Sequence, residues 1–273
     1  MLNQAHRSAD FRRLVYARHE IGGRTFLARD LNGPRIVEAL GDLDAAEHIA
    51  VMVPGNGHNQ RNYLRNADQA DSLHARGELL LATMQALAPS RRLAVITWVG
   101  YHTPANLAAA WTNGPARTGA PDLARLTQLL PASAQITLVG HSYGTTVCGL
   151  ALTTSTATDC IALGSPGMGV WRHTQLGGVR LWAAQGDSDW IRWSPHLRVG
   201  SIGLGRAALH PELGAIRFRC GDVTGHCNYH RPASESLLNT ARIAVGAYGS
   251  VSTTVATHLP EDVGTVHSPA MAA

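Results

Sequence analysis

Short apolar runs alternate with helical patterns along most of this chain, and glycine- or proline-rich turns separate them. The strand-like runs cover residues 25–30, 35–40, 49–53, 92–99, 136–139, 159–163, 179–184 and 215–219. Helical spacing marks residues 62–88, 120–130, 145–152 and 234–245. Several strands are apolar at every position, which is typical of strands covered on both faces. The pattern therefore predicts an α/β fold, a mostly parallel sheet with helices on both faces.

The two ends of the chain differ from its middle. Residues 1–24 carry no clear pattern, and the Thr-, Ser- and Ala-rich stretch after Tyr248 carries none either. We therefore expect an N-terminal segment (1–24), an α/β domain (25–248) and a C-terminal tail (249–273) that is mobile. The first two strand runs are joined by an Asn-Gly turn and predict an antiparallel hairpin at one edge of the sheet. Two loops, 100–118 and 190–213, are expected to lie over the strand ends as short lids.

Composition narrows the class of protein. With 273 residues and 45% hydrophobic residues, the chain can bury one large core. The net charge of +4 is spread without a basic block, which argues against nucleic-acid binding. No apolar run is long enough to span a membrane and no export signal is apparent, so a cytoplasmic location is expected. Oligomeric state is not indicated.

The four cysteines are expected to be free thiols. Cys148 and Cys160 fall within a predicted helix and strand, where a small core residue is the usual role. Cys220 and Cys227 bracket a loop and could pair, but without an export signal a disulfide is the less favoured state.

The stretch Gly140-His141-Ser142-Tyr143-Gly144 joins a predicted buried strand to a predicted helix. Glycines on both sides of Ser142 allow the chain to turn sharply and pass close beneath the serine. This pattern indicates a nucleophile elbow, in which the hydroxyl is raised above the sheet edge. The backbone N–H of Tyr143 would then face the oxyanion that forms on the substrate.

Candidates for the other catalytic groups follow later strands. Asp187 and Asp189 come after one strand and His226 after the next, giving the order Ser, acid, His that α/β-hydrolases use. His226 would take the proton of Ser142, and a carboxylate would fix the tautomer of the imidazole. Asp189 is favoured because its glycine-turned loop projects it toward the histidine side. Asp187 is the alternative, and Asp222 is a weaker third candidate.

A glycine-rich break, Pro54–His58, follows the predicted strand 49–53. Such a break can give a backbone N–H to an oxyanion, so the N–H of Asn56 is the expected second donor beside Tyr143.

Five tryptophans fall at or just beyond predicted strand ends, where a substrate would lie, and suggest an aromatic acyl or alcohol pocket. They are Trp98, Trp111, Trp171, Trp190 and Trp193.

Metal chemistry has little support in the sequence. His226 and His230 are four residues apart, but no carboxylate or cysteine is spaced to complete a zinc site. Most other histidines, His58 among them, are expected at the surface. We therefore expect neither a metal nor another cofactor.

Several motifs resemble the α/β-hydrolase superfamily and, more narrowly, an uncharacterised actinobacterial family of these hydrolases, DUF1023. The pieces that carry the resemblance are Ala39–Asp44, Val51–Gly57, Trp98–Tyr101, Gly140–Gly144, Leu163–Gly167 and Ser234–Leu237. The resemblance spans roughly residues 25–246. It implies an eight-stranded sheet, a triad of Ser142, Asp189 and His226, and no cofactor.

Three sites depart from that family's usual pattern. This chain has Asn56 where the family tends to carry Met, His102 where it carries Asp, and Gly225-His226-Cys227-Asn228-Tyr229 where it carries Gly-His-Ser-Asp-Tyr. All three lie near the expected site, so they suggest a specialised member of the family.

The leading hypothesis is a serine esterase or lipase-like hydrolase that cleaves a small-molecule carboxylic ester or thioester, free or carrier-bound. The alternative is an acyltransferase or thioesterase-cyclase that uses the same acyl-enzyme. A non-catalytic binding protein on this fold is the third hypothesis.

Overall fold

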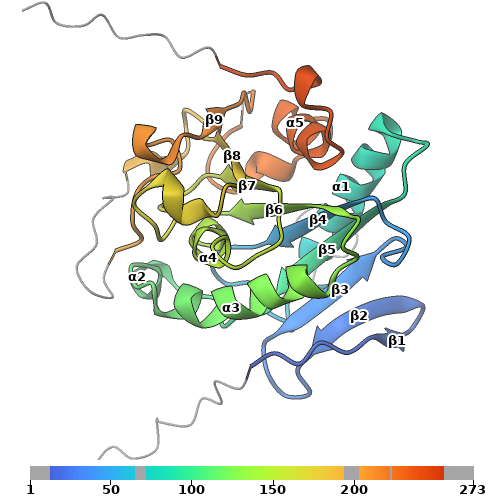
Figure 1. Ribbon diagram of the computed structural model, residues 1–273. Helices are drawn as coiled ribbons and strands as arrows, with labels where there is room; N and C mark the ends of the chain where they lie inside the picture. The colour runs from blue at the N-terminus through green and yellow to red at the C-terminus, as the bar shows by residue number, and fades with distance from the viewer. Residues whose placement is uncertain (1–12, 65–71, 194–202, 222, 255–273) are drawn as a thin grey trace, which may run out of the picture.

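The computed structural model describes residues 13–64, 72–193, 203–221 and 223–254. A nine-stranded sheet runs through the middle of the molecule (Figure 1). In spatial order its strands are β1 (His19–Ile21), β2 (Arg24–Arg29), β3 (Ile36–Leu40), β5 (Leu93–Val99), β4 (His48–Val53), β6 (Gln135–His141), β7 (Asp159–Leu163), β8 (Arg180–Ala184) and β9 (Ile216–Arg217). Strands β1, β2, β3 and β5 pair antiparallel, and every pair from β5 to β9 is parallel.

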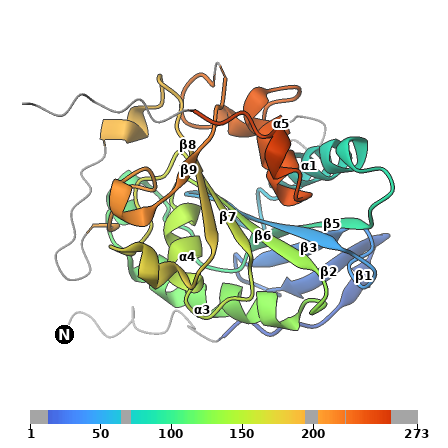
Figure 2. The same cartoon turned by 45° about the horizontal axis from the view of Figure 1, so that its top comes forward.

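Helices cover both faces of this sheet, as Figures 1 and 2 show from two directions. Helices α3 (Gly114–Leu129) and α4 (Gly144–Ala151) lie on one face, and α1 (Leu73–Leu87) and α5 (Glu235–Ala244) lie on the other. Because side chains alternate along a strand, Val51 belongs to the core on the α3 side and Met52 to the core on the α1 side. The predicted α/β fold is confirmed.

The predicted strands are all present, and the hairpin of residues 25–30 and 35–40 is formed by β2 and β3. The ninth strand, β1, was not indicated by the sequence. All three of its residues are exposed, so it has no apolar alternation, and it pairs with β2 through its backbone. It extends the sheet beyond the hairpin, which is therefore not the outermost element of that edge.

Two helices begin elsewhere than the pattern indicates. Helix α3 starts at Gly114 rather than residue 120, with a proline in its first turn and Pro121 inside it. Helix α1 starts at Leu73, where the Ser72 side chain accepts the N–H of Ala75 at 3.1 Å. Residues 65–71, which the expected helix 62–88 included, lie outside the described part of the chain. A short helix, α2 (Leu107–Ala110), lies within the first expected lid loop.

Segments near both ends pack on this domain. The N–H of Leu14 donates to Asp122 of α3 at 3.0 Å. After the 3₁₀ turn η5 (Tyr248–Ser250), Val251 is buried and Thr253 forms a β-bridge with Phe218. Residues 1–12 and 255–273 lie outside the described ranges, so the division into three parts stays a prediction.

Over the described ranges, no helix has both the length and the hydropathy that a membrane crossing requires. All four cysteines are free: Cys148, Cys160 and Cys220 are buried, and Cys227 is exposed.

Candidate active site

Ser142 sits at the turn between β6 and α4 in a conformation that few residues other than glycine adopt, with φ of 54°. The turn is possible because its neighbours lack side chains. A Cβ on Gly144 would lie 2.1 Å from the carbonyl oxygen of Val53, and one on Gly140 would lie 2.9 Å from Cα of Thr145. The backbone N–H of Ser142 donates to the carbonyl of Leu163 at 2.9 Å, which ties the turn to β7. This is the geometry of a nucleophile elbow.

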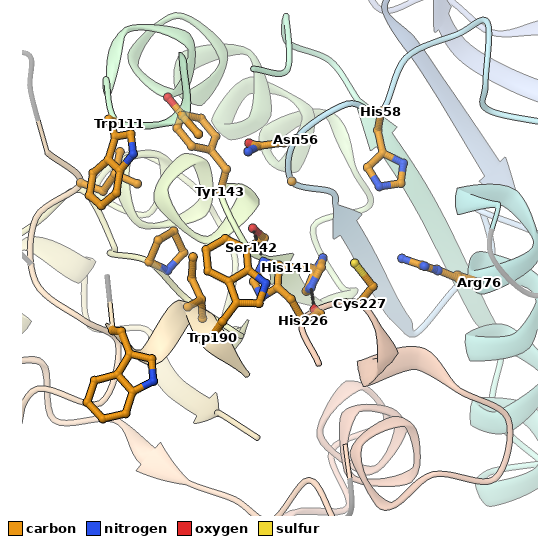
Figure 3. Close-up of a pocket in the computed structure, with 16 residues that line it drawn as sticks. Asn56, His58, Arg76, Trp111, His141, Ser142, Tyr143, Trp190, His226 and Cys227 are labelled. Atoms are coloured by element: carbon orange, nitrogen blue, oxygen red, sulfur yellow. Dashed lines mark hydrogen bonds between the residues drawn. The ribbon is translucent and has the colours of Figure 1, made fainter. Parts of the chain in front are cut away.

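Three loops that are far apart in the sequence meet at this turn. The Nε2 atom of His226 lies 2.7 Å from Oγ of Ser142 (Figure 3). The other ring nitrogen, Nδ1, lies 2.9 and 3.1 Å from the two carboxylate oxygens of Asp189. The structure therefore brings together the serine, histidine and first-choice acid that the sequence singled out.

Asp189 is fully buried and receives three donors. Besides His226, the hydroxyl of Tyr229 donates to it at 2.6 Å and the N–H of Ile191 donates at 2.9 Å. Burial alone would raise the pKa of this carboxyl, but the hydrogen bonds from His226 and Tyr229 outweigh it, and the pKa is lowered. Asp189 is thus ionised at neutral pH and can orient the imidazole.

The structure describes one of the two other acid candidates, Asp187. Asp187 is exposed, and its backbone carbonyl, not its carboxylate, accepts a hydrogen bond from Arg192. Asp222 lies outside the described residues. Among the described carboxylates, only Asp189 is hydrogen-bonded to His226.

Two residues that hold the site were not assigned such roles from the sequence. Tyr229, in the turn η4 (Asn228–His230), donates to Asp189 and accepts the N–H of Gly186 at 3.0 Å. His141 is buried, which lowers its pKa well below the usual value, so its ring is neutral. Its Nε2–H donates to the backbone carbonyl of His226 at 2.7 Å. The roles of both depend on spatial neighbours that no local motif reveals.

The two expected oxyanion donors border the serine. Within the described chain, neither the N–H of Tyr143 nor that of Asn56 donates to a protein acceptor. The Tyr143 hydroxyl donates to the carbonyl of Thr112 at 2.6 Å, so the side chain is fixed away from the serine. A Cβ on Gly55 would lie 2.7 Å from Cβ of Ser142, which places the Asn56 loop directly against this serine. Both N–H groups are available to a developing oxyanion.

A cavity of about 380 Å³ opens over Ser142. Both expected lid loops contribute to it, through Trp111 from the first and Trp190, Trp193 and Leu204 from the second. The lining is Gly55, Asn56, His58, Arg76, Ala110, Trp111, His141, Ser142, Tyr143, Pro166, Trp190, Ile191, Trp193, Leu204, His226 and Cys227. Residues 194–202 of the second loop lie outside the described ranges.

The expectation of five pocket tryptophans needs correction, because Trp98 and Trp171 do not line the cavity. Trp98 points into the core beneath α3, where it stacks on Tyr101 and donates its indole N–H to the hydroxyl of Tyr16 at 2.9 Å. Trp171 lies against the guanidinium of Arg206, whose Cζ is 5.7 Å from the centre of the indole ring. A position near a strand end does not determine which face of the sheet the side chain takes.

The cavity has two chemically different sides. In Figure 3, Trp111 and Trp190 lie on one side of the serine, while His58, Arg76 and Cys227 lie on the other. Arg76 reaches the cavity from α1 and was not predicted from the sequence to lie there. His58 was expected at the surface, but it is partly buried in the cavity wall, and burial lowers its pKa to about 4.

In the described ranges, no group of three or more His, Cys, Asp or Glu side chains is arranged to hold a metal ion.

Sequence relatives of this chain come from mycobacteria. Uncharacterized protein Rv2079 of Mycobacterium tuberculosis is 28% identical over 247 residues, covering 78% of this chain and 37% of that protein. Uncharacterized protein Rv0963c of the same organism is 29% identical over 165 residues, covering 57% of this chain and 62% of that protein. The chain thus spans less than two thirds of the length of these relatives.

Solved structures with related architecture include XC6422 of Xanthomonas campestris, an a/b serine hydrolase without lid. It is 13% identical, covers 86% of this chain and 95% of its own, and has a TM-score of 0.46. A cutinase of Trichoderma reesei in complex with a phosphonate inhibitor is 13% identical, covers 75% of this chain and 78% of its own, and has a TM-score of 0.46.

A match to a family model agrees with the fold and with the elbow at Ser142. Residues 32–199, more than half of the sequence, match the family described as Alpha/beta hydrolase. The chain belongs to the alpha/beta hydrolase family.

Proposed function

We propose that this chain is a serine hydrolase that cleaves a carboxylic ester or thioester through an acyl-enzyme on Ser142. The observation that carries the proposal is the continuous hydrogen-bonded relay from Ser142 Oγ to His226 at 2.7 Å and on to Asp189 at 2.9 Å. A serine hydroxyl is a poor nucleophile until a neutral imidazole within hydrogen-bond reach accepts its proton. A binding protein without catalysis would have no need of this alignment.

The reaction follows from the geometry. Nε2 of His226 takes the hydroxyl proton while Ser142 Oγ bonds to the carbonyl carbon, and the N–H groups of Tyr143 and Asn56 stabilise the oxyanion. The bond to the alcohol or thiol then breaks, and His226 returns the proton to that leaving group. His226 then takes a proton from water while the water oxygen bonds to the carbonyl carbon of the acyl-enzyme. The bond from that carbon to Ser142 Oγ breaks, His226 returns the proton to Oγ, and the acid is released. Asp189 stays ionised throughout and holds the Nδ1–H.

The test is the hydrolysis of short-chain 4-nitrophenyl esters and acyl thioesters by Ser142→Ala. We expect kcat/KM to fall by at least about a thousandfold, because the acyl-enzyme cannot form. Ser250→Ala, a substitution of an exposed serine in η5, is the matched control and should leave turnover intact. Unchanged turnover in Ser142→Ala would remove the proposal.

A second candidate is an acyltransferase or thioesterase-cyclase on the same triad. The tryptophan-lined side of the cavity favours it, because an apolar wall can bind an amine or alcohol acceptor beside the acyl-enzyme. Product analysis with a thioester whose thiol mimics a carrier arm, with amine and alcohol acceptors present, separates the two. Hydrolysis alone with every acceptor would count against transfer.

The substrate class, a small acyl ester or thioester that is free or carrier-bound, belongs to this proposal. The cytoplasmic location and the lack of nucleic-acid partners remain predictions from the sequence.

A further inference from the structure

Arg76 places a guanidinium in the wall of the cavity over Ser142. It projects from α1, is only 8% exposed, and in Figure 3 points from that helix toward Cys227 and the cavity. Taking a cation out of water costs free energy unless it is compensated by charge or hydrogen bonds. A buried guanidinium in a cavity wall therefore needs partners that carry charge or accept hydrogen bonds, whereas an exposed arginine can rely on water.

The titratable side chains around Arg76 are uncharged histidines. Burial, aided by the charge of Arg76, lowers the pKa of His58 to about 4 and that of His230 to about 3, so both rings are neutral at neutral pH. His141 is neutral for the same reason. Among the described lining residues none is Asp or Glu, and Arg76 alone carries a permanent charge.

A guanidinium has five N–H donors in a planar fork. It can hold a partner within its own chain on one edge and still offer donors to a ligand on another. Paired N–H groups match the two oxygens of a carboxylate or phosphate, and such charge-assisted pairs are stronger than neutral hydrogen bonds.

We propose that Arg76 binds an anionic group, a carboxylate or a phosphate, carried by the ester that Ser142 attacks. The tryptophan side of the cavity would hold the apolar part of the same molecule, with the scissile carbonyl between the two sides. This inference rests on the proposed function and names the substrate class for that site.

The test compares esters that differ only in charge. On the acyl side, the 4-nitrophenyl monoester of glutaric acid is paired with its methyl-capped diester. On the alcohol side, butyrate esters of phenols that carry a carboxylate or a phosphate are paired with one that carries a carboxamide. For at least one anionic ester, kcat/KM should exceed that of the neutral partner by about tenfold or more, mainly through KM. The two alcohol-side anions show whether carboxylate or phosphate is preferred.

Variants then assign the preference to Arg76. We expect Arg76→Gln to bring the anionic-to-neutral ratio close to one, and Arg76→Lys to keep part of it because the charge is retained. Arg92→Gln makes the same charge change at an exposed position just before β5 and should keep the full ratio. Fluorophosphonate labelling of each variant reports whether the catalytic site still forms. If Arg76→Gln does not fold, the ester pairs on the unmodified protein still show whether an anionic group is preferred.

Equal or lower turnover of every anionic ester, or an undiminished ratio in a folded Arg76→Gln, would overturn the inference. If neutral esters are turned over through Ser142 in that case, the proposed function stands while this inference falls. If no ester is turned over and no fluorophosphonate label forms, the proposed function itself fails.

Discussion

The carboxylate of Asp189 is held ionised inside the protein by its donors, and this sets what the neighbouring histidine can do. An ionised carboxylate keeps the proton of His226 on Nδ1, which leaves Nε2 free to accept the proton of Ser142. An amide in its place would lack the charge that stabilises the imidazolium.

Asp189→Asn tests this role. We expect kcat to fall by about a thousandfold or more while the protein stays folded, because the imidazole loses its preferred tautomer and its counter-charge. Asp187→Asn, at the exposed alternative acid, is the matched control and should change kcat little. Steady-state kinetics of both variants decide between the two carboxylates, and the reverse ranking would make Asp187 the acid.

Tyr229→Phe tests the residue behind the acid. Its hydroxyl donates to Asp189 and accepts the N–H of Gly186, so its loss should raise the pKa of Asp189 and lower kcat by about tenfold. Tyr248→Phe is the control. It removes a donor to Asp159 at 2.9 Å, far from the serine, so it should lower the melting temperature without lowering kcat. A Tyr229→Phe enzyme with full kcat would show that the hydroxyl only supports packing.

For single residues, the sequence indicated candidate reactive groups more readily than it indicated which way a side chain faces. Ser142 and His226 were singled out because each follows a strand in an expected order, and they lie within hydrogen-bond distance of each other. Tyr229 and Arg76 were not found, because a tyrosine in a loop and an arginine on a helix carry no local signal of what they face. Trp98 was wrongly assigned to the pocket for the same reason.

The elbow itself is an element whose shape depends on missing side chains. Gly144 packs so closely on the end of β4 that no Cβ fits, and Ser142 is held at positive φ between β6 and α4. The turn and Ser142 are therefore one structural unit.

Gly144→Ala should disrupt this unit. The added methyl group would lie 2.1 Å from the carbonyl of Val53, so β4 and α4 must separate, and we expect a loss of several kcal/mol of unfolding free energy together with activity. Gly114→Ala is the matched control, because nothing lies within 4 Å of its added Cβ in α3 and alanine favours helices. Urea unfolding of both variants measures the difference, and equal stability would contradict the close packing seen here.

Elements buried on both faces were the ones that the sequence predicted best. Their apolar runs leave little choice of structure, as in β4 and β6. The start of α3 was missed because Gly114, Pro115 and Pro121 disfavour helices locally, whereas packing on α4 stabilises the helix. β1 was missed because an exposed edge strand needs only backbone pairing.

The whole molecule carries a second buried charge network, centred on Glu38 in β3. Its carboxylate is fully buried and accepts from Arg24 at 2.7 Å, from the hydroxyl of Tyr63, and from His74 at 2.9 Å. Burial alone would raise the pKa of Glu38, but these partners lower it to about 2. The network links the antiparallel edge of the sheet to α1, the helix that carries Arg76.

Acid should therefore weaken the fold through Glu38. Its folded pKa is below its unfolded one, so its contribution is full above about pH 4.5 and is lost as the pH falls toward 2. We expect Glu38→Gln to lower the unfolding free energy by about 2 kcal/mol at pH 7, less than full linkage because Arg24 is partly exposed. Between pH 7 and 3 the variant should lose less stability than the unmodified protein. Glu212→Gln, at an exposed carboxylate in the turn η3 (Pro211–Leu213), should behave like the unmodified protein in urea unfolding.

The convergence of three distant loops on one hydroxyl can be measured most directly by reaction with a fluorophosphonate, followed by mass-spectrometric mapping of the labelled peptide. We expect one phosphonyl group per chain, on Ser142, with labelling of His226→Ala slower by at least about a hundredfold because the proton acceptor is missing. A label on another residue, or no label on the folded protein, would contradict a serine nucleophile at this site.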